Sequence, residues 1–240
     1  MPGPALRHGL QHPPQPMSDR TFHLWTCRVR HVERATVYPD GCRDVLIIRR
    51  AGEPAEVLLT PHDLRPRRVA LSAGSVLRGF RLRPGVLVSE KVLRAIADVP
   101  GQAEAILGND LRTSEEAERA IHALCVPGMT VAGAAGDLGL SARSLQRLFR
   151  GKALPPPDYW RLLARVRRAA GLLGGPLPLA VIAAECGYSD QAHMTRAMVR
   201  WIGKTPGQLR RDGATRSLLA QPALGNWSEG AATGEQISTR

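Results

Sequence analysis

Two similar stretches, residues 131–152 and 179–211, constrain what this chain can fold into. Each contains a short Ala-rich segment, a glycine, a residue suited to capping a helix, and a longer amphipathic segment. This order predicts two helices joined by a tight turn, and its recurrence about fifty residues later is harder to obtain by chance than a single match. The fold must therefore accommodate two helix-turn-helix units and the segment between them.

The first unit begins with a helix predicted over Val131–Asp137, followed by Gly139, where a helix end tolerates a left-handed residue. Ser141 is a good N-cap for a second helix that starts at Ala142. The apolar residues of this second helix have the spacing of a buried stripe: Leu145, Leu148 and Phe149. Its opposite side is polar: Arg143, Gln146, Arg147 and Arg150. Arg and Gln can bond guanine and adenine in the major groove, although an Arg-rich helix can also be a solvated surface.

The second unit repeats the pattern with a helix over residues 179–185, in which Val181 and Ile182 are core candidates. Gly187 stands where Gly139 stood, and either Ser189 or Asp190 can cap the next helix. One face of that helix is predicted to be buried: Met194, Ala197, Met198 and Trp201. A Met-rich stripe at this spacing is typical of a core and not of a cofactor site.

A third helix, opened by Pro157, joins the two units. Its roughly 17 residues would span about 25 Å, which is shorter than the ~34 Å turn that separates successive major grooves. If both units read one face of a duplex, we expect the DNA to bend.

The region from Ser114 to Arg211 resembles the AraC/XylS family of bacterial transcription regulators. The matching residues of the two units are Ala135, Gly139, Ser141, Leu145, Arg147, Phe149, Ile182, Ala183, Gly187, Tyr188, His193, Arg196, Gly203, Pro206 and Arg210. Those of the joining helix are Arg165, Ala169, Leu172 and Leu173. The chain departs from the family at Leu154, where Gly is usual, and at Met194 and Met198, which replace an aromatic pair.

The resemblance implies which residues contact bases and backbone: Arg143, Gln146 and Arg147 in the first unit, and Gln191, Ala192, Thr195 and Arg196 in the second. Ala192 can touch a thymine methyl group but cannot hydrogen-bond to a base. Arg150, Lys152 and Lys204 are expected to add salt-sensitive affinity for phosphate.

The region of residues 21–86 is predicted to be β-rich, with strand-like runs at 36–38, 45–48, 57–60, 69–71 and 77–82. Its YPDGC and GFRLRPG strings resemble the small β-rich N-terminal domain of some AraC-like regulators. That resemblance implies a half-barrel sensor domain with room for an effector. Helices are predicted at 88–98, 102–107 and 114–124, so that residues 87–113 form a helical linker that could dimerise, and the reading domain covers 114–212.

Both ends of the chain, residues 1–20 and 213–240, have compositions that predict disorder. Residues 1–20 lack the apolar segment of a signal peptide, and Met17 is an alternative start to Met1. No apolar run is long enough to cross a bilayer, and the cysteines show no disulfide or metal spacing, so we expect a cytoplasmic protein.

The net charge of +12 suits a polyanionic partner, and its distribution favours DNA. Residues 141–216 carry fourteen cations and four anions, so most of the excess lies in the helix-turn-helix region. A membrane surface would need a broad apolar face, which these helices are predicted to use for packing.

Catalysis is not expected, and neither a cofactor nor a metal site is predicted. The histidines lack HxH spacing, the chain has no phosphate-binding glycine motif, and its Asp residues form no evident carboxylate pair. Cys42 lies beside Arg43, where a lowered thiol pKa would allow redox sensing, although simple packing is the commoner fate of a cysteine.

The sequence thus predicts an α+β protein: a half-barrel-like β-rich sensor domain followed by an all-α domain with two helix-turn-helix units joined by a long helix. The function predicted is sequence-specific DNA-binding transcription regulation through two adjacent major grooves. Expected partners are double-stranded DNA, RNA polymerase if the protein activates, a small-molecule effector and a second copy of the chain, but no membrane. The alternative is a small-molecule-binding protein whose helical half is a protein-partner surface.

Overall fold

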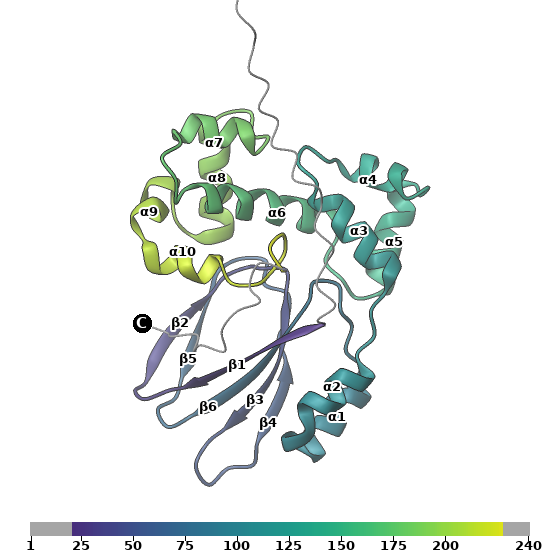
Figure 1. Ribbon diagram of the computed structural model, residues 1–240, viewed down its shortest axis with the longest axis vertical. Coiled ribbons are helices and arrows are strands. Elements are labelled where there is room, and N and C mark those ends of the chain that lie inside the picture. The colour runs from purple at the N-terminus through teal and green to yellow at the C-terminus, as the bar shows by residue number, and fades with distance from the viewer. Residues whose placement is uncertain (1–20, 228–240) are drawn as a thin grey trace, which may run out of the picture.

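The computed structural model describes residues 21–227, which form a β-rich half and a helical half (Figure 1). The α+β fold class predicted from the sequence is confirmed. The predicted tail at residues 1–20 and the last part of the other tail, residues 228–240, lie outside the described residues.

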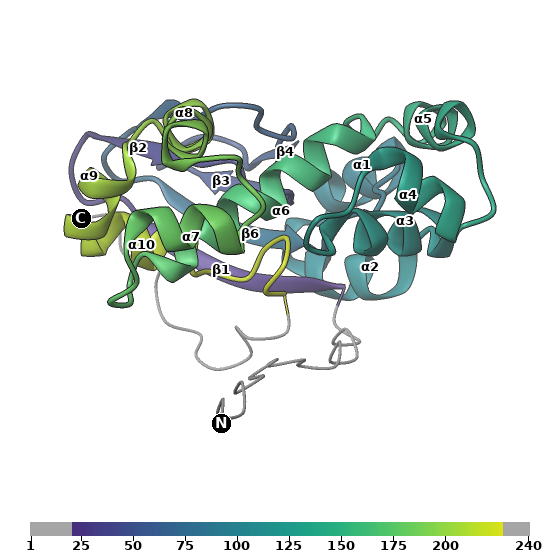
Figure 2. The same ribbon diagram turned by 90° about the horizontal axis from the view of Figure 1, so that it is seen from above.

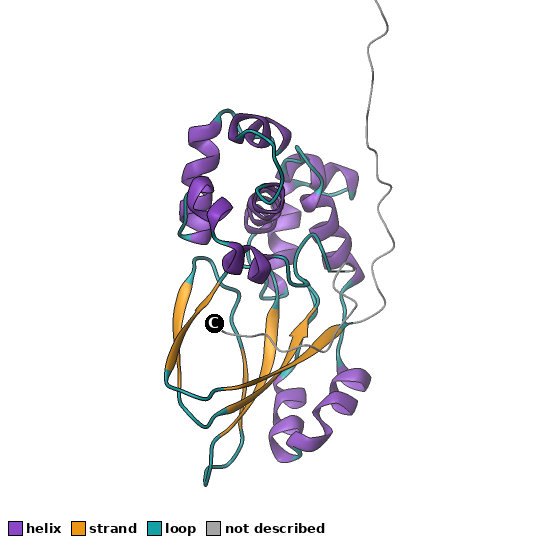
Figure 3. Ribbon diagram, turned by 60° about the vertical axis from the view of Figure 1, so that its left-hand side comes forward, coloured by secondary structure: helices purple, strands orange, loops and turns teal. Residues whose placement is uncertain are grey.

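The β-rich half contains two antiparallel sheets that together curve into an incomplete barrel (Figure 3). The strands are β1 (Phe22–Arg28), β2 (Glu33–Val37), β3 (Arg43–Arg49), β4 (Glu56–Leu59), β5 (Arg67–Leu71) and β6 (Val76–Leu82). Four of them pair in the order β1-β6-β3-β4, and β2 pairs with β5. All five strand-like runs that the sequence indicated are strands, and β1 is an additional edge strand that no run had marked.

One face of the four-stranded sheet is apolar because alternate residues of its central strands point to it. Val45 and Ile47 of β3 and Phe80 and Leu82 of β6 are all buried. Two helices, α1 (Glu90–Asp98) and α2 (Ala103–Asp110), complete this core and are joined by the short 3₁₀ helix η1 (Pro100–Gln102). They correspond to the helical linker of the sequence analysis.

The helical half is built around α6 (Pro157–Leu172), whose Trp160 is fully buried. The other helices are α3 (Glu115–Cys125), α4 (Val131–Asp137), α5 (Ala142–Gly151), α7 (Leu179–Glu185), α8 (Gln191–Ile202), α9 (Pro206–Arg211) and α10 (Gly213–Leu219). One hydrophobic core runs from α3 through α6 to α8 and α9. The predicted helices of both units and the joining helix are confirmed, whereas α9 and α10 were not predicted.

The prediction of a disordered tail from residue 213 is wrong for residues 213–227. After α10, residues 220–227 run between the helical half and the sheets (yellow in Figure 1); we call them the clasp. Leu224 N–H donates to the Asp40 carbonyl (2.9 Å), and Ala223 and Trp227 pack with Cys42 in a small buried cluster. Tertiary contacts of this kind give a defined structure to a segment whose composition alone predicts disorder.

The clasp is held from the other side by Arg167 of α6. Its guanidinium donates to the carbonyls of Leu224 (3.0 Å) and Leu219 (2.9 Å) and to the Asn226 side chain (3.2 Å). The approach to the β-rich half is close, because a Cβ at Gly41, whose φ is +80°, would lie 2.9 Å from the Leu224 Cβ. The YPDGC turn, residues 38–42, is therefore an interface between the two halves.

Candidate DNA-binding surface

The turns of the two units have the same backbone geometry. Gly139 and Gly187 have φ of +67° and +71°, in the left-handed region where glycine carries no Cβ penalty. In each turn the next residue donates its N–H to an alanine carbonyl of the preceding helix: Leu140 to Ala135 (2.8 Å) and Tyr188 to Ala183 (2.9 Å). The repeat predicted from sequence is a structural repeat.

Each turn is followed by a capped helix, as the sequence predicted. Ser141 accepts from the N–H of Ser144 (3.1 Å) at the start of α5. At the start of α8 the cap is Asp190, which accepts from the N–H of His193 (2.6 Å). That hydrogen bond is the main cause that lowers the pKa of Asp190.

The turn at the end of α5 has a left-handed residue that is not glycine. Leu154 donates its N–H to the Phe149 carbonyl (2.9 Å), as in the two unit turns, and the left-handed residue is Ala153, with φ of +52°. Ala153 is therefore the residue of this turn whose backbone conformation favours Gly. Leu154 is instead buried.

We expect Ala153→Gly to raise the free energy of unfolding by about 1 kcal/mol, since a left-handed alanine carries that order of strain and Gly does not. Urea unfolding of the variant and the parent protein measures the difference. Ala132→Gly, in the right-handed backbone of α4, is the matched control and should lower the free energy of unfolding by a similar amount. Equal losses from both substitutions would contradict strain at Ala153.

The predicted reading faces of both helices point to solvent. In α5, Leu145 and Phe149 are buried, and the four polar residues are exposed: Arg143, Gln146, Arg147 and Arg150. In α8, Met194 and Met198 are fully buried, which confirms them as core. Three of the α8 candidates are exposed, namely Gln191, Ala192 and Arg196. Thr195 is half-buried and donates its hydroxyl to the Gln191 carbonyl (2.9 Å).

The two reading helices have similar orientations. In Figure 2 both α5 and α8 are seen nearly end-on towards the same edge of the molecule, and α6 runs between the two units. With 16 residues, α6 is about 24 Å long. Two similarly directed helices that expose Arg and Gln on one side of the protein suit adjacent segments of a major groove.

Several arginines that contribute to the positive charge are used inside the protein. Arg165 of α6 donates to the Gly187 carbonyl (3.2 Å) and lies 4.5 Å above the Tyr188 ring. Arg168 donates to the Cys125 carbonyl (2.9 Å), and Arg210 to that of Leu177 (2.5 Å). These side chains stabilise helix ends and turns, so the exposed arginines of α5 and α8 remain the main candidates for contact with phosphate and bases.

The cations outside the two faces differ in their burial and in their ion pairs. Lys152 follows α5 and is half-buried. Lys204, in the loop after α8, forms an ion pair with Asp212 and donates to the Thr215 hydroxyl (2.9 Å). The hydrogen bond from Lys204 to Asp212 is the main cause that lowers the pKa of Asp212. Arg200, which sequence reasoning did not place in the DNA set, is exposed one turn after Arg196, and this i,i+4 spacing was the signal for it.

One expectation about a single residue is wrong. Val181 is exposed by 40% because α7 buries only Ile182 and Ala183. Cys42 is buried, which agrees with the packing that the sequence favoured. Desolvation raises the pKa of its thiol well above the usual value, which is the opposite of what the redox alternative requires. Within residues 21–227, no three His, Cys, Asp or Glu side chains come together as a metal site requires, and no helix combines the length and apolar character needed to cross a bilayer.

A family model described as "Helix-turn-helix domain" matches residues 134–212, from α4 through α9. The C-terminal part of the chain is an AraC-type helix-turn-helix domain. The match includes both turns, α5, α6 and α8, and it supports a DNA-binding transcription regulator. The resemblance found in the sequence is thereby confirmed.

Parts of the chain are also similar to solved structures. A transcriptional regulator with an AraC-type DNA-binding domain from Chromobacterium violaceum is 24% identical over 45% of this chain and 95% of its own, with a TM-score of 0.37. The C-terminal domain of AraT, a response regulator from Geobacillus stearothermophilus, is 27% identical over 42% and 87%, with a TM-score of 0.39. ToxT K231A from Vibrio cholerae strain SCE256 is 8% identical over 81% and 98%, with a TM-score of 0.41.

Proposed function

We propose that this regulator binds specific DNA by placing α5 and α8 in two adjacent segments of the major groove. The observation that carries the proposal is the pair of similarly directed helices, each packed by an apolar face and each exposing Arg and Gln. Arg143, Gln146 and Arg147 would read and orient from α5. Gln191, Ala192, Thr195 and Arg196 would do so from α8, with α6 too short to reach a full helical turn unless the DNA bends.

The remaining cations would act through charge. Arg150, Lys152 and Lys204 are proposed to contact phosphate, and Arg200 joins them on α8. Lys204 would have to exchange its ion pair with Asp212 for a phosphate, so its contribution should be the smallest of the four.

The proposal is tested first by selection of genomic fragments that the purified protein binds. Two short sequence blocks about one helical turn apart are expected, because each block is read by one helix. Recovery of no motif, with binding that only follows the salt concentration, would refute specific reading.

We expect Arg147→Ala and Arg196→Ala each to weaken binding to the selected site by about 1 to 3 kcal/mol, since each removes a bidentate donor to a base. Titration of labelled duplex with each variant gives the affinity, and a random duplex gives the non-specific reference. Arg147→Lys separates charge from reading, because it keeps the charge and loses the planar fork.

Arg94→Ala is the matched control, since Arg94 is exposed on α1, paired with Glu90 and remote from both reading helices. Its specific affinity should equal that of the parent protein. If Arg147→Ala and Arg196→Ala also behave like the parent on both duplexes, the assignment of these residues is wrong.

The proposal includes partners beyond DNA. RNA polymerase is one if the protein activates transcription, and a small-molecule effector and a second copy of the chain are others. The cytoplasm is the proposed compartment, supported by Cys42, Cys125 and Cys186, which are free thiols, as expected in a reducing environment.

A further inference from the structure

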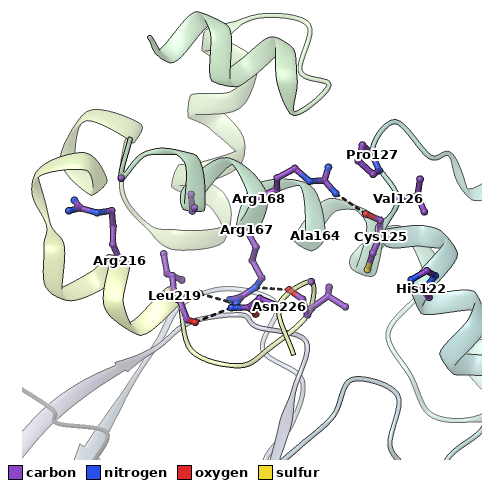
Figure 4. A pocket seen from close by; sticks show the side chains of 16 residues that line it. His122, Cys125, Val126, Pro127, Ala164, Arg167, Arg168, Arg216, Leu219 and Asn226 are labelled. Carbon is purple, nitrogen blue, oxygen red and sulfur yellow. Dashed lines mark hydrogen bonds between the residues drawn. The ribbon is translucent and has the colours of Figure 1, made fainter. Parts of the chain in front are cut away.

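A cavity of about 770 Å³ lies between α3, α6 and the C-terminal segment, outside the β-rich half (Figure 4). Its size is in the range that holds a small organic molecule. One wall is the last turn of α3 and the loop after it, the floor is α6, and the other wall is formed by α10 and the clasp. It is separate from the exposed faces of α5 and α8.

The lining combines an apolar surface with positive charge. Its charged members are all cationic, Arg167, Arg168 and Arg216, and neither Asp nor Glu lines it. The apolar members include Val126, Ala164 and Leu219. Cations beside an apolar surface favour a ligand that has one anionic group and an apolar body.

The three guanidiniums have different roles. Arg167 is already occupied by the clasp, and Arg216 donates to the carbonyls of Leu209 (3.0 Å) and Arg210. Arg168 leaves α6 towards the wall formed by the end of α3, where one of its N–H groups bonds the Cys125 carbonyl (2.9 Å; Figure 4). A guanidinium has five N–H donors, so Arg168 is the residue best placed to bind an anion.

We propose that this cavity is a binding site for a small amphipathic anion, with Arg168 as its anion receptor and the apolar surface of α6 and α10 against its body. The ligand would contact α6, which joins the two reading units, and the clasp, which bonds to Asp40 of the β-rich half. The inference that an effector of the regulator binds in this cavity rests on the proposed DNA-binding function. The inference that the cavity binds an amphipathic anion does not depend on that function.

The test uses anilinonaphthalene sulfonate as an anionic probe and the uncharged phenylnaphthylamine as its neutral counterpart, with fluorescence titration of the full-length protein. We expect one saturable site for the sulfonate and binding of the neutral dye weaker by about tenfold or more. Arg168→Gln should remove this preference. Equal affinity of the parent protein for the two dyes would overturn the anion assignment.

A second variant blocks the cavity without altering charge. Gly171 lines the cavity from α6, and a Cβ built there meets nothing within 4 Å, so Gly171→Leu should fold and fill the space. This substitution should weaken binding of the sulfonate dye by about tenfold or more. Gly108→Leu, in α2, is the matched control because its Cβ is equally unobstructed, and it should bind the dye as the parent does. Unchanged dye binding by Gly171→Leu would refute the site.

The same variants separate this inference from the proposed function. In the absence of dye, Gly171→Leu and Gly108→Leu should bind the selected DNA site like the parent protein. Loss of the dye site with DNA binding intact supports the cavity alone, whereas absence of a DNA motif refutes the regulator proposal and leaves the dye result unaffected.

Discussion

Arg81→Met should lower the free energy of unfolding by about 3 to 5 kcal/mol, because removal of one partner leaves two poorly solvated carboxylates without their cation. Arg81 of β6 lies 3.4 Å from an Asp40 oxygen and 3.5 Å from an Asp44 oxygen. The side chains of all three are at most 20% exposed. Arg81 also donates to the Gln221 side chain (3.3 Å), so the loss should weaken the contact with the clasp. Urea unfolding measures the difference.

The control for Arg81→Met is Arg78→Met in the same strand. Arg78 pairs with Glu104 at 3.0 Å, but the Glu104 side chain is 59% exposed, so solvent screens the pair and its loss should cost about 1 kcal/mol or less. Similar losses for the two variants would mean that the Arg81 cluster is solvated and contributes little.

The pH dependence of the Arg81→Met effect identifies its cause. Burial already raises the pKa of Asp40, and Arg81 opposes this rise. Without Arg81 the pKa of Asp40 should rise further, so protonation at acidic pH should neutralise the carboxylate and reduce the destabilisation. A loss that stays constant between neutral and acidic pH would indicate lost packing and not an uncompensated charge.

The local pattern of the sequence was enough to predict most elements of the helical half. Gly139 and Gly187 mark the two turns, Ser141 and Pro157 mark helix starts, and the apolar spacing identifies the buried faces. These signals work because each depends on backbone conformation within a few residues. The polar faces of α5 and α8 follow from the same periodicity, so the exposure of most of the candidate residues could also be predicted.

Long-range contacts determine what the sequence pattern could not show. Residues 220–227 have no periodicity and are ordered by Arg167, Asp40 and the cluster around Trp227. Composition likewise counts Arg165 and Arg168 as free positive charge, whereas the fold directs both onto main-chain carbonyls. The raised pKa of Cys42 has the same origin, because its burial depends on the clasp that packs over it. Knowledge of the neighbours in space is needed for each of these.

His62 should make the protein sensitive to acid in a defined pH range. It lies between β4 and β5, with its ring centroid 5.5 Å from that of Trp160 and 6.2 Å from that of Tyr159, so it packs against α6. Burial, with Arg43 as a second cause, lowers the pKa of His62 from 6.5 to about 4. The folded protein therefore disfavours the imidazolium form that the unfolded chain accepts.

Stability falls as the pH is lowered because the unfolded chain binds the proton of His62 more tightly than the folded protein does. Above pH 6.5 His62 is neutral in both states, and its contribution to stability is fully present. As the pH falls from about 6.5 to about 4, the unfolded chain takes up the proton first, and stability decreases by about 3 kcal/mol in total. Below that range the folded state is protonated as well, and the loss from this residue stops.

His62→Phe isolates this effect, because it retains an aromatic ring against Trp160 and removes the titration. Urea unfolding at a series of pH values should show the difference between parent and variant change by about 3 kcal/mol across this range. His31→Phe, at an exposed histidine between β1 and β2, is the control substitution. If the free energy of unfolding of His62→Phe changes with pH as that of the parent protein does, His62 is accessible to water in the folded state, and any sensitivity to acid comes from other groups.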